Sequence, residues 1–251
     1  IAKIENQEGV DNIDEILDYA YGVMIARGDL AIEIPKERIP IMQKQLIRKC
    51  IERRKPVITA TQMLHSMIKN PRPTRAEVSD VANAIYDGSD AIMLSGETAY
   101  GNYALESVKT MSQIALEIEN DKCGFLEIPL VVLNNEISAY LTKSAVKASY
   151  RIKNVRAIVA DSTSGRTIRA LAAYRGNKPI YAICYNKKVM RELALSYGVY
   201  PTDIELRDNT DEFLDYSISK LLRKKVVDKD DLIVVLAGNF GRSYGASFIE
   251  V

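Results

Sequence analysis

Charged and hydroxyl side chains stand at the ends of four apolar segments in the first half of the sequence. They are Lys3 and Glu5, then Asp29, then Thr61, then Ser95. The segments alternate with amphipathic helical patterns, which is typical of parallel β-α-β units whose strands are buried on both faces. In a β/α barrel, the residues just past the strand ends meet on one face, where active sites lie. A doubly wound open sheet gives the same local pattern, so periodicity favours the barrel only slightly.

Glu5 and Asp29 follow successive predicted strands, so their carboxylates are expected to lie side by side. Oxygen ligands of this kind suit Mg²⁺ or Mn²⁺. Lys3 suits the transfer of a phosphoryl group, because that chemistry depends on positioning and on cations that neutralise negative charge. The alternative is that the two acids are solvated or pair with Lys3 and Arg27. From the residues alone, a metal site and solvated or ion-paired acids are equally supported.

The helical segments carry their own end signals. Asn12 with Glu15, and Thr74 with Glu77, have the spacing of capping boxes, and Gly88 is placed to end a helix. Another helical stripe consists of Met42, Leu46, Ile47 and Cys50. These patterns predict helices between the successive strands of the first half.

Five strings occur in order in the first half: AKIEN, ARGDL, ITATQML, NPRPTRAEVSDVANAI and IMLSGET. Together they resemble the pyruvate kinase family from the second half of its barrel onward, over Ile1 to about Glu119. One departure is Ala31, because the family usually has Gly after ARGDL. The resemblance implies an α/β fold that begins with the second half of a (β/α)8 TIM barrel. It also implies that the first four strands and an inserted lid domain precede Ile1 in the parent protein.

The resemblance implies roles for the residues at the strand ends. Lys3 and Thr61 would be catalytic. Lys3 and Asp29 would also bind phosphoenolpyruvate, whose carboxylate would be held by the main chain at Gly28 and the Thr61 hydroxyl. Glu5 and Asp29 would bind Mg²⁺ or Mn²⁺. A helix N-cap is the alternative role for Thr61.

Two further residues of the first half have open roles. Ser95 belongs either to a proton path toward the enolate or to a plain capping turn in the string SGET. His65 is the single histidine of the chain, so it has no companions for a metal cluster or a catalytic triad. We interpret His65 as a surface or packing residue.

The periodicity breaks after Glu119. The string NDKCGFLEIPLVVLNNE predicts a linker over residues 120–135, between a half-barrel domain of residues 1–119 and a smaller α/β domain of residues 136–251. The second domain resembles, more loosely, the C-terminal domain of the pyruvate kinase family. In many members that domain binds a phosphorylated effector and helps to build the tetramer.

One loop of the second domain has the composition of a phosphate site. Its residues are Ser162, Thr163, Ser164, Gly165, Arg166 and Thr167. Main-chain N–H groups at a helix start, hydroxyls and an Arg can cradle a phosphate. Spacing alone favours a Ser/Thr helix cap instead, whereas the resemblance favours the phosphate site.

A second loop, AGNFGRSYG with Arg242, closes over the same ligand or is only a hairpin connection. No Walker A string occurs in the sequence, so binding of a nucleotide by a P-loop is not predicted.

Composition excludes several classes of protein. The 251 residues contain 34 Lys and Arg against 33 Asp and Glu, so a broad electrostatic footprint for nucleic acid is not expected. No apolar run reaches the roughly 20 residues that span a bilayer, so no membrane partner is expected. Cys50, Cys123 and Cys184 have no CxxC spacing, which indicates free thiols in a reducing compartment, and we expect a cytoplasmic protein.

The resemblance therefore predicts magnesium-dependent transfer of phosphate from phosphoenolpyruvate to ADP, giving pyruvate and ATP in glycolysis, by a homotetramer. Potassium is implied by the family, but its site is not in this chain. Two alternatives remain: a metal-dependent barrel lyase acting on pyruvate enolates, and a non-catalytic regulatory or oligomerisation module. We expect the chain by itself to be inactive.

Overall fold

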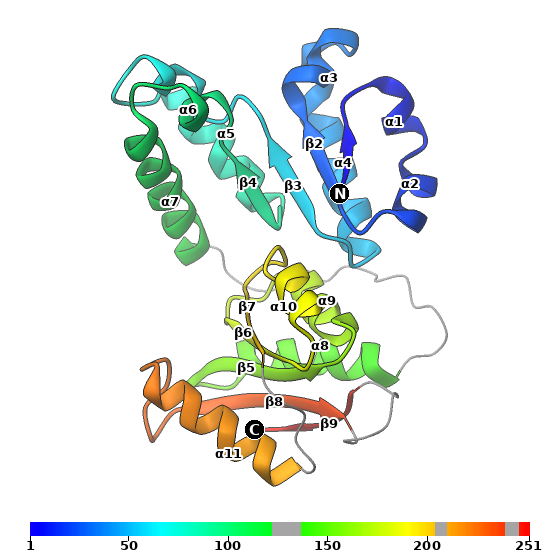
Figure 1. Cartoon of the computed structure of the whole chain (residues 1–251), viewed down its shortest axis with the longest axis vertical. Coiled ribbons are helices and arrows are strands. Elements are labelled where there is room, and N and C mark those ends of the chain that lie inside the picture. Colours follow the sequence, from blue (N-terminus) through cyan, green and yellow to red (C-terminus); the bar gives the residue numbers. More distant parts are fainter. Residues whose placement is uncertain (122–136, 204–209, 239–245) are drawn as a thin grey trace. The chain divides into compact units, whose positions relative to one another are not determined.

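The computed structural model describes residues 1–121, 137–203, 210–238 and 246–251. These residues belong to two compact units, unit 1 (Ile1–Cys123) and unit 2 (Gly124–Val251) (Figure 1). Helix α7 (Ala104–Asp121) ends unit 1, so the predicted domain end at residue 119 falls inside this helix. Past Asp121, the predicted linker lies outside the described residues.

Strands and helices alternate along unit 1. Its strands are β1 (Ala2–Ile4), β2 (Val23–Ala26), β3 (Val57–Ala60) and β4 (Ala91–Met93). Its other α-helices are α1 (Gln7–Asp11), α2 (Ile13–Tyr19), α3 (Arg27–Glu33), α4 (Ile39–Glu52), α5 (Arg75–Tyr86) and α6 (Gly96–Ala99). Two short 3-10 helices are η1 (Lys36–Arg38) and η2 (His65–Ile68).

The strands of unit 1 are parallel and follow the chain order β1-β2-β3-β4 in the described sheet. A doubly wound sheet reverses its strand order at a switch point, whereas a barrel adds each new strand on the same side. The order is therefore that of a barrel segment, and the predicted α/β class is confirmed. In the described part of the chain, β1 and β4 have no neighbour on their outer edges.

Local sequence signals explain some helix ends and not others. Thr74 and Glu77 form the predicted capping box at the start of α5. The predicted box of Asn12 and Glu15 is wrong, because the Asn12 side chain makes no cap bond and donates to the Glu8 carbonyl of the preceding helix α1. Asn12 joins two short helices, and this junction withdraws its amide from the capping position.

Helix α3 is an element that the sequence patterns did not predict. It begins at Arg27, directly after β2, so the string ARGDL forms the first turn of a helix instead of an extended tip. Leu30 of this turn is fully buried. Its burial stabilises a helix of only seven residues that has no side-chain N-cap.

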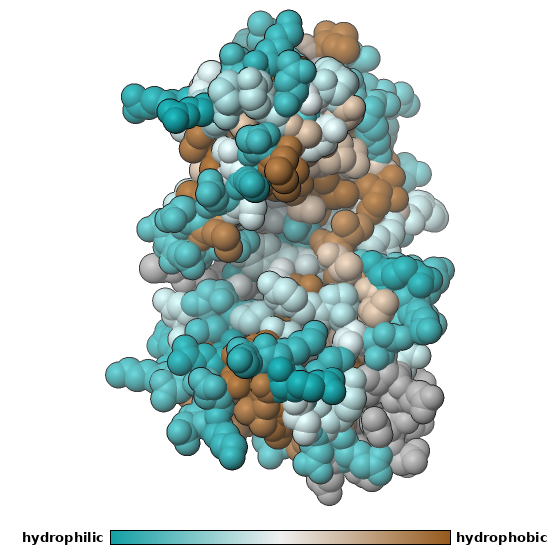
Figure 2. Space-filling view, turned by 60° about the vertical axis from the view of Figure 1, so that its left-hand side comes forward, coloured by the Kyte–Doolittle hydropathy of each residue, from teal (hydrophilic) through white to brown (hydrophobic). Residues whose placement is uncertain are grey.

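The core of unit 1 lies between its sheet and its helices. Ile25 and Val57 of the strands, with Leu46 and Ile47 of α4, are almost completely buried, as the stripe in α4 predicts. The helix α7 also carries apolar side chains that face solvent, and apolar surface is visible on unit 1 in the upper part of Figure 2. These exposed side chains are Leu105, Val108 and Leu116.

Unit 2 is a separate α/β layer. Its strands are β5 (Val155–Ser162), β6 (Ile180–Cys184), β7 (Val199–Asp203), β8 (Leu232–Gly238) and β9 (Ala246–Glu250). Its helices are α8 (Ile137–Arg151), α9 (Arg166–Ala173), α10 (Lys187–Leu193) and α11 (Thr210–Arg223). The described sheet has the order β7-β6-β5-β8-β9, with β9 antiparallel to β8.

The chain of unit 2 starts its sheet in the middle, so the strand order reverses between β5 and β8. Helix α11 lies on one side of the sheet and α8 and α9 on the other (Figure 1). Phe213 of α11 is fully buried against Val159 and Val235 of the central strands. Such a reversal opens a crevice outside the carboxyl ends of the two strands, where α/β proteins bind ligands.

Two of the three cysteines lie in the described residues. Cys50 and Cys184 are both buried, and neither forms a disulfide, as predicted. Burial raises the pKa of the Cys184 thiol to about 11, so it stays protonated and unreactive near neutral pH. Cys123 lies outside the described residues. Within the described ranges, no helix is long and apolar enough to cross a membrane.

Candidate active site at the strand ends of unit 1

Lys3 stands between two carboxylates at the carboxyl end of the sheet. Its Nζ forms an ion pair with Glu5 and lies 2.8 Å from Asp29 Oδ2. The parallel register of β1 and β2 brings these residues together, because Ile4 pairs with Ile25 and Asp29 follows in the first turn of α3. Sequence reasoning therefore predicted this cluster correctly as a neighbourhood.

The Lys3 cluster is open to solvent. The side chains of Lys3, Glu5 and Asp29 are 49%, 45% and 44% exposed. Hydrogen bonds to Asp29 and Glu5 raise the pKa of Lys3, so it carries a positive charge at neutral pH. Half-exposed ion pairs contribute little to folding stability. The cluster is thus charged, pre-assembled and accessible to a ligand.

Glu5 and Asp29 carry the type of oxygen donor that suits a divalent cation. Both carboxylates pair with the Lys3 ammonium, as the alternative interpretation predicts, so this ammonium holds the position on which their oxygens converge. Mg²⁺ is commonly held by one or two carboxylates, with water and substrate oxygens completing its octahedron. In the described part of the chain there is no group of three or more metal-ligating side chains. Glu5 and Asp29 would therefore supply only part of the coordination shell.

Gly28 and Thr61 form a second contact beside the cluster. The Gly28 main-chain N–H donates to Thr61 Oγ1 over 2.7 Å. A Cβ at position 28 would lie 3.2 Å from this oxygen, so glycine allows the close approach of the two loops. Because Thr61 accepts this bond through its oxygen, its hydroxyl proton is free to point at an anion.

The loop after β3 has an unusual backbone. Thr61 and Gln62 have φ angles of 70° and 55°. The left-handed region is unfavourable for a β-branched residue, and such residues cost on the order of 1–3 kcal/mol unless their surroundings hold them. No described helix has Thr61 as its N-cap, since η2 follows Leu64. The N-cap alternative for Thr61 is therefore wrong.

Arg27 is a buried charged residue whose contacts the sequence patterns did not predict. The sequence suggested it only as a partner for Glu5 or Asp29. In the structure it is 7% exposed and pairs with Asp80 of α5 at 2.7 Å. The one available signal was its place in ARGDL beside Gly28. Periodicity could not reveal that its side chain turns inward, away from the two acids.

The fourth strand end is held by a buried carboxylate. Glu97 is 1% exposed and accepts main-chain N–H bonds from Leu64 at 3.0 Å and Ser95 at 2.9 Å. It therefore ties the third loop to the fourth. Ser95 is the N-cap residue of α6, so the string SGET does form a turn at a helix start, but the Ser95 side chain makes no cap bond. Its Oγ is buried without a hydrogen-bond partner in the described residues, and the proton path stays a prediction. His65 is exposed, which agrees with its predicted surface role.

The predicted phosphate loop of unit 2 joins β5 to α9. Ser162 is the last residue of the strand, and Arg166 is the first residue of the helix. Gly165 is the N-cap and has a left-handed φ of 78°. Ser162 Oγ accepts the Gly165 N–H over 2.8 Å, and Ser164 Oγ accepts the Arg166 N–H over 3.4 Å.

The two interpretations of this loop, a phosphate site and a Ser/Thr helix cap, predict different contacts at the start of α9. Serines do bind N–H groups of the loop, as a capping turn requires, but no side chain caps the helix at its N-cap in the described residues. Thr163, Ser164 and Arg166 are exposed, whereas Ser162 and Thr167 are buried. Arg169 also reaches back, and its Nη2 donates to the Ser164 carbonyl over 3.3 Å. The second loop, with Arg242, lies outside the described residues.

Comparison with known proteins matches each of the two units to a family model. A family model described as pyruvate kinase, barrel domain, matches residues 1–108, and one described as pyruvate kinase, alpha/beta domain, matches residues 140–251. A protein named pyruvate kinase from Borreliella burgdorferi is 46% identical over 255 residues, which are 100% of this chain and 53% of that protein. One of the same name from Bacillus licheniformis is 48% identical over 254 residues, covering 100% of this chain and 43% of that protein. One from Geobacillus stearothermophilus is 50% identical over 240 residues, covering 95% and 41%.

The singly wound sheet, with charges converging at its strand ends, defines the first unit as a barrel-type α/β domain, and a second α/β domain follows it. With both family models matched in order, the chain belongs to the pyruvate kinase family. It spans about half the length of the curated relatives that it matches. The relatives do not favour the lyase or the non-catalytic module.

Proposed function

We propose that this chain supplies the metal, phosphoryl and carboxylate contacts of an enzyme that transfers phosphate from phosphoenolpyruvate to ADP. The observation that carries the proposal is the convergence of Lys3, Glu5 and Asp29 beside the Gly28–Thr61 contact. One cation, two carboxylates and a hydroxyl at adjoining strand ends are the groups that phosphoryl transfer needs.

In this reaction, the phosphorus–oxygen bond of phosphoenolpyruvate breaks and phosphorus bonds to the terminal oxygen of ADP. The enolate that remains takes up a proton and becomes pyruvate. Lys3 stabilises negative charge on the transferring group. The Thr61 hydroxyl donates to the substrate carboxylate. The Gly28 N–H, which the resemblance implied as a second donor to that carboxylate, donates to Thr61 Oγ1 and sets the direction of the hydroxyl. Glu5 and Asp29 would hold Mg²⁺ or Mn²⁺, which neutralises phosphate charge when bound.

The activity can be tested in a chimera. This chain replaces the matching half of the Borreliella burgdorferi relative, so that the rest of that protein supplies the remaining barrel strands. We expect the chimera to form pyruvate and ATP with a requirement for a divalent metal. We expect the chain alone to show no turnover, because its described sheet has four of the eight strands of a barrel.

The unmodified relative serves as the positive control. Circular dichroism and a cooperative melting transition check that the chimera is folded. A folded chimera without turnover would contradict the proposed function, and so would turnover by this chain alone. Pyruvate release without ATP formation would instead support the lyase.

We also propose that the loop Ser162–Thr167 binds the phosphate of a small effector. The specific observation is that this loop lies at the reversal of strand order beside an uncapped helix start. Arg166 is exposed and can form a charge-assisted bond to phosphate. For the whole enzyme we propose, in addition to this effector site, that it is a homotetramer, that it is cytoplasmic and that it requires potassium.

Calorimetry on this chain tests the effector site, with inorganic phosphate and a panel of sugar phosphates as probes. Loss of a charge-assisted bond costs about 1.5–3 kcal/mol, so Arg166→Ala should weaken binding at least about tenfold. Ser162→Ala should have a smaller effect. Arg223→Ala, at an exposed position in the last turn of α11, is the matched control. No binding at millimolar concentration, or binding unchanged by Arg166→Ala, would leave the loop as a helix start only.

A further inference from the structure

The side chain of Arg27 connects the strained loop after β3 to two helices. Its guanidinium makes contacts through both terminal nitrogens. The contacts are Nη2 to the Thr61 carbonyl (2.8 Å), Nη2 to Met63 Sδ (2.8 Å), Nη1 to Asp80 Oδ1 (2.7 Å) and Nη1 to Gln43 Oε1 (3.2 Å). Two contacts therefore hold the loop, and the other two fix the guanidinium to α4 and α5.

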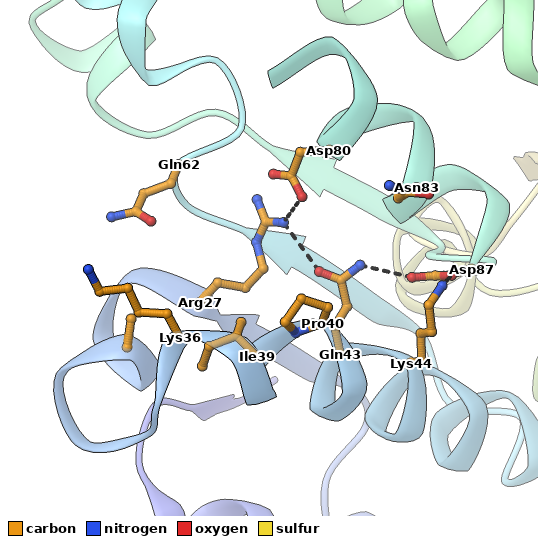
Figure 3. Close-up of a pocket in the computed structure, with 11 residues that line it drawn as sticks. Arg27, Lys36, Ile39, Pro40, Gln43, Lys44, Gln62, Asp80, Asn83 and Asp87 are labelled. Carbon is orange, nitrogen blue, oxygen red and sulfur yellow. Dashed lines mark hydrogen bonds and ion pairs between the residues drawn. The ribbon is translucent and has the colours of Figure 1, made fainter. Parts of the chain in front are cut away.

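The fixed side of this arrangement extends further into the helices. Gln43 Nε2 donates to Asp87 Oδ2 over 2.9 Å, and Asp87 also pairs with Lys44. Figure 3 shows Arg27 among Gln62, Asp80 and Gln43, along one wall of a pocket of about 370 Å³. The guanidinium is therefore held by α4 and α5 as well as by the loop.

The loop needs such a contact because its backbone is strained. Thr61 and Gln62 both lie in the left-handed region. Other anchors hold the loop further along, where Glu97 binds the Leu64 N–H and Glu77 binds the Ser66 N–H. Among the described residues, Arg27 is the side chain that binds the carbonyl of Thr61 itself.

Folding stability alone does not require an arginine here. Burying a guanidinium costs desolvation, and its partner Asp80 has a side chain that is 38% exposed. A well-packed apolar side chain often serves a buried position as well or better. What an apolar residue or a lysine lacks is a rigid planar fork that donates in several fixed directions.

We propose that Arg27 is a positioning residue, which sets the direction of the Thr61 hydroxyl by holding the Thr61 carbonyl, although Arg27 itself touches no substrate. The structural part of this inference stands on the contacts above. Its catalytic consequence rests on the proposed function, because Thr61 is there the donor to the carboxylate of phosphoenolpyruvate.

Amide hydrogen exchange on this chain tests the structural part without any activity. The Gly28 amide is a direct probe, because its N–H donates to Thr61 Oγ1. Arg27→Ala should speed exchange at Gly28 at least about tenfold. The amides of β2 should keep their protection, and so should Leu64 and Ser66, which have their own carboxylate anchors. Arg53→Ala, which removes surface ion pairs with Asp14 and Asp18 in the same unit, is the matched control and should change none of these sites.

Unchanged exchange at Gly28 in a folded Arg27→Ala variant would overturn the inference. Equal acceleration across the whole unit would also overturn it, because that result indicates general destabilisation. If Arg27→Ala does not fold, Asp80→Asn replaces it, since this change weakens the Nη1 anchor and keeps the shape of the side chain. It should speed exchange at Gly28 about threefold, and no acceleration there would count against the inference.

Kinetics of the chimera test the catalytic part. Arg27→Lys should raise the KM for phosphoenolpyruvate at least about tenfold and leave the half-saturating magnesium concentration unchanged. A merely structural role would lower the apparent kcat through loss of folded enzyme, with the KM unchanged, and would contradict the inference. If the unmodified chimera has no activity, the proposed function fails, whereas hydrogen exchange still decides whether Arg27 positions the loop.

Discussion

The loop after β3 in unit 1 and the loop after β5 in unit 2 both contain residues with a left-handed backbone, but different contacts hold the two loops in place. Each joins a parallel strand to the next helical segment, and in each a hydroxyl oxygen accepts a main-chain N–H. In unit 2 the partners are Ser162 and Gly165, three residues apart. In unit 1 they are Thr61 and Gly28, which are 33 residues apart.

The two loops also place their left-handed residues differently. Unit 2 uses Gly165, for which this conformation costs little, so its loop needs no external support. Unit 1 uses Thr61 and Gln62, so it depends on Arg27 and on helices far away in the sequence. A loop whose hydrogen bonds join residues close in sequence can therefore be predicted from those residues. A loop that is held by residues distant in sequence cannot.

The largest expected effect concerns the charges beside the unit 1 loop. In the chimera, Lys3→Met should lower kcat at least about a hundredfold and change the KM for phosphoenolpyruvate much less, because its charge acts mainly in the transition state. Glu5→Gln and Asp29→Asn should instead raise the half-saturating magnesium concentration. The matched change in unit 2, Arg166→Ala, should leave turnover without effector unaltered. Near-normal kcat in Lys3→Met would refute this division of roles.

The second prediction addresses the glycine that makes the unit 2 loop self-sufficient. An added Cβ at Gly165 would meet Arg169 Nη1 at 2.6 Å, Leu193 Cδ2 at 3.2 Å and Val189 Cγ1 at 3.3 Å, besides the strain of its positive φ. The Arg169 side chain is flexible and can move aside, so the two apolar contacts set the cost. Gly165→Ala should lower the free energy of unfolding of unit 2 by about 1–3 kcal/mol, as measured by urea denaturation.

Gly198 provides the control for strain alone. It also has a positive φ, but a Cβ there would have no heavy atom within 4 Å. Gly198→Ala should therefore cost less than Gly165→Ala, by roughly 1 kcal/mol. Equal losses would mean that the packing around Gly165 does not matter.

The third prediction concerns Glu77, which combines local and distant contacts in unit 1. Burial would raise its pKa, but hydrogen bonds from Ser66 and Thr74 outweigh burial and lower it. Since the folded-state pKa is depressed, this stabilisation is present above the unfolded-state pKa of about 4.3 and is lost as the pH falls through the folded-state pKa. Glu77→Gln should destabilise unit 1 by about 1 kcal/mol at pH 7.

Thermal melts from pH 7 to pH 3 would measure this effect. The difference in melting temperature between wild type and Glu77→Gln should shrink toward the acid end. A difference that stays constant with pH would show that the charge of Glu77 contributes nothing.

The smallest expected effect lies next to the unit 2 loop, at Asp161. Burial raises its pKa, although the Tyr185 hydroxyl donates to it over 3.1 Å. The folded state therefore holds the proton more tightly than the unfolded state, and relative stability is lost as the pH rises through the folded-state pKa. Asp161→Asn should raise the melting temperature slightly at pH 7, and the gain should disappear below about pH 4. A lower melting temperature at pH 7 would contradict this sign.

Several features of this chain follow from its sequence alone. Apolar runs that alternate with amphipathic stripes determine parallel β-α units, because such strands are buried on both faces when amphipathic helices cover the sheet. The Thr74–Glu77 capping box and the turn formed by residues 162–167 can also be predicted from the sequence, because the hydrogen-bond partners in each lie within a few residues of one another. The five strings in order, from AKIEN to IMLSGET, indicate the pyruvate kinase family, and AKIEN and ARGDL hold Lys3, Glu5 and Asp29 at successive strand ends.

Only the tertiary structure decided how Arg27, Thr61 and Asp80 meet. Their separations in sequence are tens of residues, and no periodic pattern relates them, so their contacts depend on the register of β2 with β3 and on where α5 packs. The direction of the Arg27 side chain follows from the same packing, because a buried guanidinium turns to where its donors find acceptors. Contacts between residues close in sequence can therefore be predicted from the sequence. The support of a strained loop by residues distant in sequence is revealed only by the tertiary structure.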